Sequence, residues 1–233
     1  MKQTMELRVI ARIRTEFPGK FGIPRQSGLV ESLRATIVFE PEFRSADALR
    51  GIEGYSHLWL IWQFSQCVSE DGSWSPTVRP PRLGGNKRVG VFATRAPYRP
   101  NPIGLSSVKL EEVRLNTPDG PVLVVSGADL MDGTPIYDIK PYLAYVDSHP
   151  EATDGFALAQ KEGVLSVDCP EGLLARLSAK KRQALIDVLA QDPRPQYQKD
   201  PRRVYQFEFA GMHVEFSVEN DRLTVCSVEP AEK

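Results

Sequence analysis

Residues 7–13 read Leu-Arg-Val-Ile-Ala-Arg-Ile, so apolar and arginine side chains alternate with a period of two. Successive side chains of a β-strand point to opposite faces, and this pattern predicts a half-buried strand with its arginines in solvent. Similar short segments follow, separated by turns rich in Gly and Pro. They cover residues 35–40, 57–64, 88–94, 108–115, 122–128 and 135–139, and only residues 45–50 between them are expected to be helical.

Many strands at short spacing, without long amphipathic helices between them, favour an antiparallel barrel or sandwich over a βαβ architecture. The sequence contains no GxGxxG and no GxxxxGK[ST] motif, so the usual phosphate-binding fingerprints of Rossmann and P-loop folds are missing. We therefore expect a mainly β protein whose first domain is a small antiparallel β-barrel.

The composition changes after Tyr145, where residues 149–155 are rich in Pro, Asp and small side chains. Leucines near helical spacing then predict a helix within residues 171–191, with Lys180, Lys181 and Arg182 on its opposite side. Three short β-segments follow, at 204–209, 213–218 and 223–228. These signals predict two domains: a barrel over residues 1–148 and a small α+β module over residues 149–233.

Length and composition limit the function classes. The 233 residues carry a net charge of -1 and are 41% hydrophobic, which fits a globular protein with a real core and excludes a uniformly basic nucleic-acid binder. No apolar run resembles a signal peptide or a membrane span. Cys67, Cys169 and Cys226 are far apart, which fits a cytoplasmic protein, and three dispersed histidines make a metal site unexpected.

The stretch VRPPRLGGNKRVGVFATRAPYRPNPIGLS at residues 78–106 is the richest in chemistry, and residues 72–110 contain no Asp or Glu. Pro and Gly hold such loops in fixed shapes, and guanidinium groups on them bind phosphates or carboxylates. The pattern predicts a site for a polyanion. The alternatives are that the basic residues form a solvated face and that Pro and Gly only fix turns. The basic residues are Arg79, Arg82, Lys87, Arg88, Arg95, Arg99 and Lys109.

Two other stretches carry polar groups. In SGADLMDGTPIYDIKPYLAY, at residues 126–145, the carboxylates of Asp129, Asp132 and Asp138 either meet a ligand or cap turns, and Asp138 with Lys140 can form a surface pair. In the loop at residues 20–28, Arg25 and Gln26 can recognise planar polar groups through paired hydrogen bonds. The aromatic residues at 54–64 are expected mainly in the core.

Taken together, these segments resemble the TsaA-like family of bacterial tRNA methyltransferases, over essentially the whole chain. The segments are PRQ at 24–26, GYSHLWLI at 54–61, TVRPPRLGGN at 77–86, GVFATRAPYRPNPIGLS at 90–106, DLMDGTPIYDIKPY at 129–142 and QDPRPQY at 191–197. The resemblance implies a small β-barrel methyltransferase that acts as a homodimer, with S-adenosylmethionine held near the subunit interface. The implied reaction is N6-methylation of threonylcarbamoyl-adenosine next to the anticodon of a threonine tRNA.

The resemblance also implies site residues. For S-adenosylmethionine they are Pro24, Arg25, Gln26, Ser65, Gln66, Arg95, Leu105, Gly127, Ala128, Asp129 and Leu130. The resemblance leads us to expect His or another polar residue at position 65, where this chain has Ser. The basic residues expected to bind tRNA are Arg79, Arg82, Lys87, Arg88, Arg99 and Lys140, with Tyr98 available to stack on a base.

Methyl transfer needs positioning above all, and removal of the N6 proton would help the transfer because the lone pair of a urea-like nitrogen is delocalised. Asp138 is the candidate base, and Asp129 and Tyr137 are the alternatives. The C-terminal module, with Arg194, Lys199, Arg202 and Arg203, either extends the grip on tRNA or is a dimer-stabilising or purely structural appendage. Two other functions remain open at this point: a non-catalytic RNA-binding or regulatory module of the same fold, and a methyltransferase with a non-tRNA acceptor.

Overall fold

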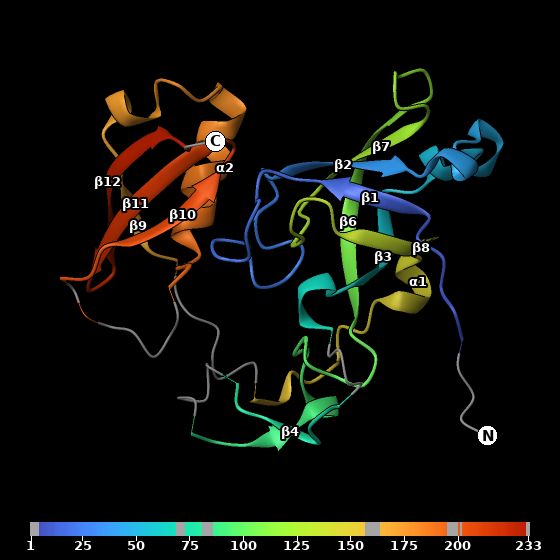
Figure 1. Ribbon diagram of the computed structural model, residues 1–233, viewed down its shortest axis with the longest axis horizontal. Coiled ribbons are helices and arrows are strands. Elements are labelled where there is room, and N and C mark those ends of the chain that lie inside the picture. Colours follow the sequence, from blue (N-terminus) through green and yellow to red (C-terminus); the bar gives the residue numbers. More distant parts are fainter. Residues whose placement is uncertain are drawn as a thin grey trace.

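The computed structural model describes residues 5–68, 73–80, 86–156, 164–194, 200 and 202–231. Figure 1 shows two β-rich parts side by side: a barrel built from strands within residues 11–141, and a smaller sheet with one long helix near the C-terminus. The mainly β architecture predicted from the strand spacing is confirmed.

The first part is a closed barrel in which all neighbouring strands are antiparallel. Going round it, the strands follow the order β1-β2-β7-β6-β3-β8. Their bounds are β1 Ala11–Arg14, β2 Arg34–Phe39, β3 His57–Gln63, β6 Ile103–Arg114, β7 Val122–Ser126 and β8 Pro135–Pro141.

Alternation along the strands fills the barrel. On β1, Ala11 and Ile13 are fully buried while Arg12 and Arg14 are exposed, as the sequence pattern predicts. On β3, Leu58, Leu60 and Trp62 point inward and pack in the same core. Burial of one face of each strand therefore fixes which side chains remain outside the barrel.

Several expected elements differ in extent. The first strand begins only at Ala11, and the strand expected at 88–94 is limited to β5 Val89–Gly90, which pairs with β4 Thr77–Val78. The chain then turns in a 3-10 segment, Val91–Ala93, because both the backbone N–H and the hydroxyl of Thr94 donate to the Val91 carbonyl, at 3.1 and 2.8 Å. The helix expected at 45–50 is present as a short 3-10 segment, Ala46–Leu49. Other short helical segments are Pro41–Phe43, Ile52–Gly54, Ser65–Cys67 and α1 Ala144–Asp147.

The second part is a four-stranded sheet in the order β10-β11-β12-β9. Its elements are β9 Ser166–Asp168, a 3-10 segment Glu171–Leu174, α2 Ala179–Ala190, β10 Tyr205–Phe209, β11 Met212–Glu219 and β12 Arg222–Pro230. The meander β10–β12 is as predicted, but β9, which pairs parallel to β12, was not expected. The single helix expected within 171–191 is divided, since Ser178 has extended backbone at the start of α2.

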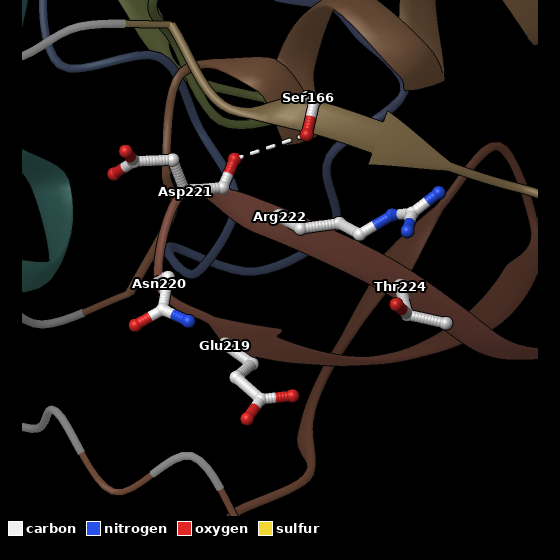
Figure 2. A pocket seen from close by; sticks show the side chains of 6 residues that line it. All are labelled: Ser166, Glu219, Asn220, Asp221, Arg222 and Thr224. Carbon is white, nitrogen blue, oxygen red and sulfur yellow. Dashed lines mark hydrogen bonds between the residues drawn. The ribbon is translucent and has the colours of Figure 1, made fainter.

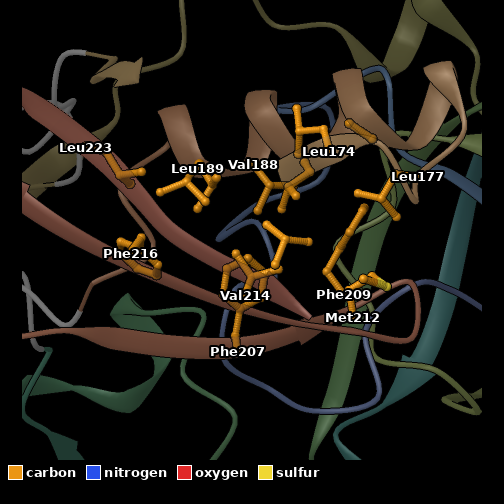
Figure 3. Packing of buried hydrophobic residues seen from close by; sticks show 14 of the residues in the cluster. Leu174, Leu177, Val188, Leu189, Phe207, Phe209, Met212, Val214, Phe216 and Leu223 are labelled. Carbon is orange, nitrogen blue, oxygen red and sulfur yellow. The ribbon is translucent and has the colours of Figure 1, made fainter. Parts of the chain in front are cut away.

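The core of the C-terminal part lies between α2 and the sheet, where Leu174, Leu189, Phe209 and Phe216 are among the buried side chains (Figure 3). Three residues from the segment between β1 and β2 belong to the same core: Phe17, Val30 and Leu33. In Figure 1 this segment, drawn in blue, reaches from the barrel towards α2. The connection between the first two barrel strands therefore packs against the C-terminal part.

Candidate functional site

The loop at residues 26–28 is attached to the end of the barrel at several points. The Arg95 guanidinium donates to Oε1 of Gln26. The Ser107 N–H on β6 donates to Oγ of Ser27 at 3.2 Å, and the Gly28 N–H donates to the Gly127 carbonyl just after β7 at 2.8 Å. These bonds bring together residues that are far apart in the sequence.

Asp129 lies beside this loop and is mostly buried. Oγ–H of Ser106 donates to its Oδ1 at 2.6 Å, and Ser106 Oγ in turn accepts from Nε1–H of Trp62 at 2.9 Å. Burial raises the pKa of the Asp129 carboxyl, while hydrogen bonds from Ser106 and from backbone N–H groups, together with the charge of Arg95, act in the opposite direction. The site thus contains a desolvated carboxylate next to an arginine.

Two glycines allow the close contacts around Asp129. Gly127 has φ of +74°, and a Cβ there would lie 3.3 Å from the Gly28 backbone. A Cβ at Gly104 on β6 would lie 2.3 Å from Cε2 of Trp62. Glycine is therefore needed where β6 and β7 approach the loop and the indole ring.

The structure brings some of the predicted cofactor residues together and leaves others apart. Gln26, Arg95, Gly127 and Asp129 form one cluster, which we call the polar cluster. Ala128 and Leu130, on either side of Asp129, are buried in the barrel core. The predicted cofactor residues that lie outside the polar cluster and the core segment beside it are Pro24, Arg25, Ser65, Gln66 and Leu105.

Of these, Ser65 and Gln66 lie in the 3-10 segment that follows β3, and Nε2 of Gln66 is 3.1 Å from Sδ of Met131. Leu105 is 58% exposed on β6 and directly precedes Ser106. Pro24 is buried, and Arg25 points to the C-terminal part, where one of its terminal nitrogens donates to the backbone carbonyls of Asp192 and Arg194.

Asp138 occupies a different surface from Asp129. In the register of the barrel, Asp138 on β8 is opposite Ile61 on β3, and Ile61 is opposite Leu105 on β6. The surface pair allowed by the sequence is formed, with Nζ of Lys140 2.9 Å from the Asp138 carboxylate. The neighbouring Tyr137 hydroxyl donates to Oε1 of Gln63 at 2.6 Å, and burial raises the pKa of Tyr137.

The basic residues expected to bind tRNA lie mainly around the β4–β5 ribbon. Arg79 follows β4 and Arg88 precedes β5, so both lie at the same end of the ribbon, and Lys87 is exposed beside them. Arg88 also donates to Thr77 Oγ1 at 3.1 Å, and Arg99 donates to the Thr94 carbonyl at 3.0 Å. The prediction for Arg82 lies outside the described residues.

Aromatic side chains are exposed near this ribbon. Trp74 and Phe92 are 50% and 73% exposed, and their ring centroids are 6.1 Å apart. Tyr98 is 64% exposed. An exposed aromatic surface next to arginines is chemically suited to stack on unpaired bases.

Sequence reasoning missed several residues of the polar cluster's surroundings: Ser27, Gly28, Trp62 and Ser106. The Ser-Gly pair directly follows the PRQ segment, which was the only available signal for it. The inward hydroxyl of Ser106, 1% exposed among apolar neighbours, becomes notable only once the barrel is closed.

A separate hollow of about 330 Å³ lies in the C-terminal sheet. Figure 2 shows its lining at the β11–β12 turn, where Ser166 Oγ donates to the Asp221 carbonyl at 3.1 Å. Its lining is polar and none of the predicted site residues belongs to it. The lining residues are Ser166, Glu219, Asn220, Asp221, Arg222 and Thr224.

Within the described ranges, no group of three or more His, Cys, Asp or Glu side chains is arranged to hold a metal ion. In the same part of the chain, no helix is both long and apolar enough to cross a membrane.

The closed antiparallel barrel, the polar cluster at its end and the appended α+β unit together define a class of two-part β-barrel proteins with known crystal structures. The structure titled TrmO from P. aeruginosa matches with a TM-score of 0.78 and 34% sequence identity, covering 99% of both chains. A second TrmO structure from Pseudomonas aeruginosa has a TM-score of 0.76 at 34% identity, covering 97% of this chain and 99% of the other.

Sequence comparisons give the family. The model for the tRNA-methyltransferase O N-terminal domain matches residues 12–148, and that for the TrmO C-terminal domain matches residues 164–231. The tRNA (adenine(37)-N6)-methyltransferase of Escherichia coli K12 is 41% identical, covering 95% of this chain and 96% of the relative. The protein of the same name from Eikenella corrodens is 43% identical, covering 76% and 99%. The chain belongs to the tRNA-methyltransferase O family.

Proposed function

We propose that this protein is an S-adenosylmethionine-dependent tRNA methyltransferase that methylates N6 of threonylcarbamoyl-adenosine next to the anticodon of a threonine tRNA. The observation that carries the proposal is the family match over both parts of the chain, together with the polar cluster at the end of the barrel. The names of the relatives support the reaction, since those from E. coli and Eikenella corrodens are adenine(37)-N6 enzymes.

The polar cluster suits the chemistry of the cofactor. The amino-acid part of S-adenosylmethionine is a zwitterion, and the cluster offers both the Arg95 guanidinium and the Asp129 carboxylate, next to the amide of Gln26. The exposed Leu105 beside Ser106 offers an apolar contact for a flat ring. The proposed cofactor site contains Pro24, Arg25, Gln26, Ser65, Gln66, Arg95, Leu105, Gly127, Ala128, Asp129 and Leu130. When bound, the cofactor supplies a methyl group activated by its sulfonium.

The protein's own residues then bind and orient the acceptor. Basic side chains around the β4–β5 ribbon contact phosphates, and Tyr98 stacks on an unpaired base. The proposed tRNA contacts are Arg79, Arg82, Lys87, Arg88, Arg99 and Lys140. Holding the acceptor nitrogen in line with the methyl group accounts for most of the expected rate.

Asp138 is the proposed general base, which takes the N6 proton as the methyl group is transferred. Its side chain is 46% exposed, so an acceptor base can reach the carboxylate, and the Asp138–Ile61–Leu105 row connects it to the proposed cofactor contact. Asp129 is less accessible and already accepts the Ser106 hydroxyl. The raised pKa of Tyr137 keeps its proton on the oxygen, which suits a hydrogen-bond donor better than a base.

We further propose that the enzyme acts in the cytoplasm as a homodimer, and that residues 1–148 and 149–233 form its two domains. The exposed apolar side chains of Ile103 and Leu105 on β6 support a partner surface close to the cofactor site. Sedimentation of the purified protein tests the dimer directly.

Two assays test the function. Calorimetry with S-adenosylmethionine should detect binding, and Arg95→Ala should abolish it, while exposed Arg176→Ala serves as the matched control. Methyl incorporation should require tRNA that carries the threonylcarbamoyl group. Absence of cofactor binding at millimolar concentration would favour a non-catalytic RNA-binding module, and incorporation without tRNA would show a different acceptor.

The role of Asp138 as general base has its own test. Asp138→Asn should bind the cofactor normally but lose turnover by roughly 10²- to 10⁴-fold.

A further inference from the structure

The turn at residues 191–194, part of the QDPRPQY segment, has no role in the proposed reaction. It ends α2: Asp192 has φ of 49°, and its N–H donates to the Leu189 carbonyl at 3.2 Å. The Asp192 carboxylate accepts from Nε and Nη2 of Arg194 at 2.8 and 2.9 Å. These side chains are only 15% and 11% exposed, so a shielded two-point ion pair fixes the shape of the turn.

The turn presents two carbonyl oxygens to Arg25. One terminal nitrogen of Arg25 lies 2.9 Å from the Asp192 carbonyl and 2.9 Å from the Arg194 carbonyl. A charged donor between two backbone acceptors forms stronger hydrogen bonds than a neutral donor would. Pro24, Arg25, Asp192 and Pro193 leave between them only a small cavity of about 40 Å³.

The residues that follow Arg25 form their hydrogen bonds with the barrel and not with the C-terminal part. Gln26 accepts from Arg95, Ser27 accepts from the backbone of Ser107, and Gly28 donates to Gly127. The chain therefore changes partners between residues 25 and 26, from the C-terminal part to the polar cluster.

Other contacts hold the same segment on the C-terminal part. Ser32 donates to the Asp187 carboxylate on α2, and Lys181 Nζ is 2.9 Å from the carboxylate of Glu16. A Cβ at Gly22, which has φ of +91°, would lie 2.3 Å from the Phe207 ring. Gly22 is thus pressed against β10, and little room exists for the segment to shift.

We infer that Arg25 is a positioning residue: the turn at 191–194 holds Arg25, and Arg25 holds residues 26–28 in the conformation that binds the cofactor. The C-terminal part thereby sets the affinity of a site to which it contributes no predicted contact. The inference rests on the proposed function, because it assumes that the polar cluster binds S-adenosylmethionine.

Calorimetry on the full-length protein tests the coupling. Asp192→Gly removes the carboxylate but keeps the positive φ without strain. Asp192→Gly and Arg25→Ala should each weaken S-adenosylmethionine binding by roughly 5- to 150-fold. The double variant should bind S-adenosylmethionine about as tightly as the single variant with the lower affinity, because both substitutions break one network. Arg25→Lys should recover part of the affinity, since an ammonium can still donate to the carbonyls.

Steady-state kinetics separate positioning from a general loss of structure. Each variant should raise KM for S-adenosylmethionine while kcat at saturating cofactor stays near the wild-type value. Arg222→Ala is the matched control: it breaks an exposed ion pair with Asp168 at 3.3 Å in the same C-terminal part and should leave cofactor affinity unchanged. Asp192→Asn, which tolerates positive φ, replaces the glycine variant if circular dichroism shows that the latter does not fold.

The outcomes are distinguishable. If the wild-type protein does not bind the cofactor, the proposed function fails. If the wild-type protein binds and the folded Asp192 variant binds equally well, the coupling is wrong and the function stands. If the effects of the Arg25 and Asp192 substitutions simply add, Arg25 acts independently of the turn, and the inference is overturned.

Discussion

At the scale of single residues, Asp129 shows how burial and hydrogen bonding compete. The carboxylate is removed from water at the end of the barrel, which raises its pKa, although Ser106 and Arg95 both favour the charged form. A desolvated carboxylate costs stability that a ligand with a matching group can recover. We therefore interpret Asp129 as a binding residue, in line with the proposed cofactor site.

Asp129→Asn tests this interpretation. A folded-state pKa above the unfolded value means that the contribution of Asp129 to stability is complete below the unfolded pKa and is lost as pH rises through the folded pKa. Since Asn does not titrate, the free energy of unfolding of the variant relative to wild type should rise between about pH 4 and about pH 7. Urea unfolding at the two pH values measures it.

In the same variant, cofactor affinity should fall about tenfold or more, because an amide cannot replace a carboxylate opposite a cationic group. Exposed Asp154→Asn is the control and should change the free energy of unfolding by less than about 0.5 kcal/mol. A variant that is less stable near neutral pH and binds the cofactor normally would show that Asp129 is structural.

At the scale of elements, β6 connects the site to the barrel. Its residues Ser106 and Ser107 bond to Asp129 and Ser27, and its Gly104 faces the Trp62 ring on β3. Further along, a bulge between Leu110 and Glu112 interrupts its pairing with β7. One strand thus contacts the site near its start and carries a bulge in its pairing with β7 further along.

Gly104→Ala should destabilise the protein, because the new Cβ would lie 2.3 Å from the Trp62 ring. Overpacking of this kind costs about 1–3 kcal/mol, measurable as a lower midpoint in urea. Gly90→Ala is the control, since no atom lies within 4 Å of a Cβ there. Equal stability of both variants would mean that β3 and β6 separate at little cost.

Glu111, at the bulge, joins three strands. Arg34 Nη1 on β2 lies 2.5 Å and Lys109 Nζ 3.4 Å from its carboxylate, and Ser126 on β7 donates to it at 2.7 Å. The Arg34 hydrogen bond, followed by that of Ser126, lowers the pKa of Glu111 to about 2. Its stabilising contribution is therefore present above the unfolded pKa and is lost as pH falls through about 2.

Glu111→Gln should lower the free energy of unfolding near neutral pH by about 1–2 kcal/mol, towards the low end for hydrogen bonds to a charged group because the partner Arg34 is half exposed. The difference from wild type should disappear as pH falls from 4.5 towards about 2. Glu112→Gln is the comparison, because its pair with Arg114 is exposed and should matter less. A difference that does not depend on pH would contradict the assignment.

At the scale of the whole molecule, charge is distributed unevenly despite a net charge of -1. The stretch from residue 72 to residue 110 has no acidic side chain. Its described part carries Arg79, Lys87 and Arg88 at one end of the β4–β5 ribbon, and Arg99, which donates to the Thr94 carbonyl. Such a surface attracts a polyanion even though the protein as a whole does not.

The affinity for tRNA falls as salt concentration rises. Replacing Arg79 and Arg88 together by Ala should make this dependence shallower, reducing the magnitude of the slope of log affinity against log salt concentration by about 0.7–0.9 per lost contact. Filter binding at several salt concentrations measures the slope. The control is Arg176→Ala, because Arg176 pairs with Glu229 at 3.1 Å in the C-terminal part. An unchanged slope in the double variant would place the tRNA elsewhere.

The sequence predicts local structure well where side-chain alternation is strong. β1, β3 and the β10–β12 meander follow their apolar patterns, because burying one face of a strand determines its period. The sequence predicts local structure poorly where a segment becomes a strand only through pairing with another strand. β9 is three residues long with little pattern of its own and exists as a strand because β12 pairs with it.

Side-chain patterns along the chain are enough to predict the strand-rich architecture, the acid-free basic stretch and the set of segments that resembles one family. Which of those segments meet depends on how the chain folds. Arg25 and the turn at 191–194 are far apart along the chain, and Asp129 meets Ser106 only because β6 and the segment after β7 converge at one end of a closed barrel. Contacts of this kind depend on how the strands close and how the connection between β1 and β2 packs on α2 and its sheet, and no local pattern of residues encodes them.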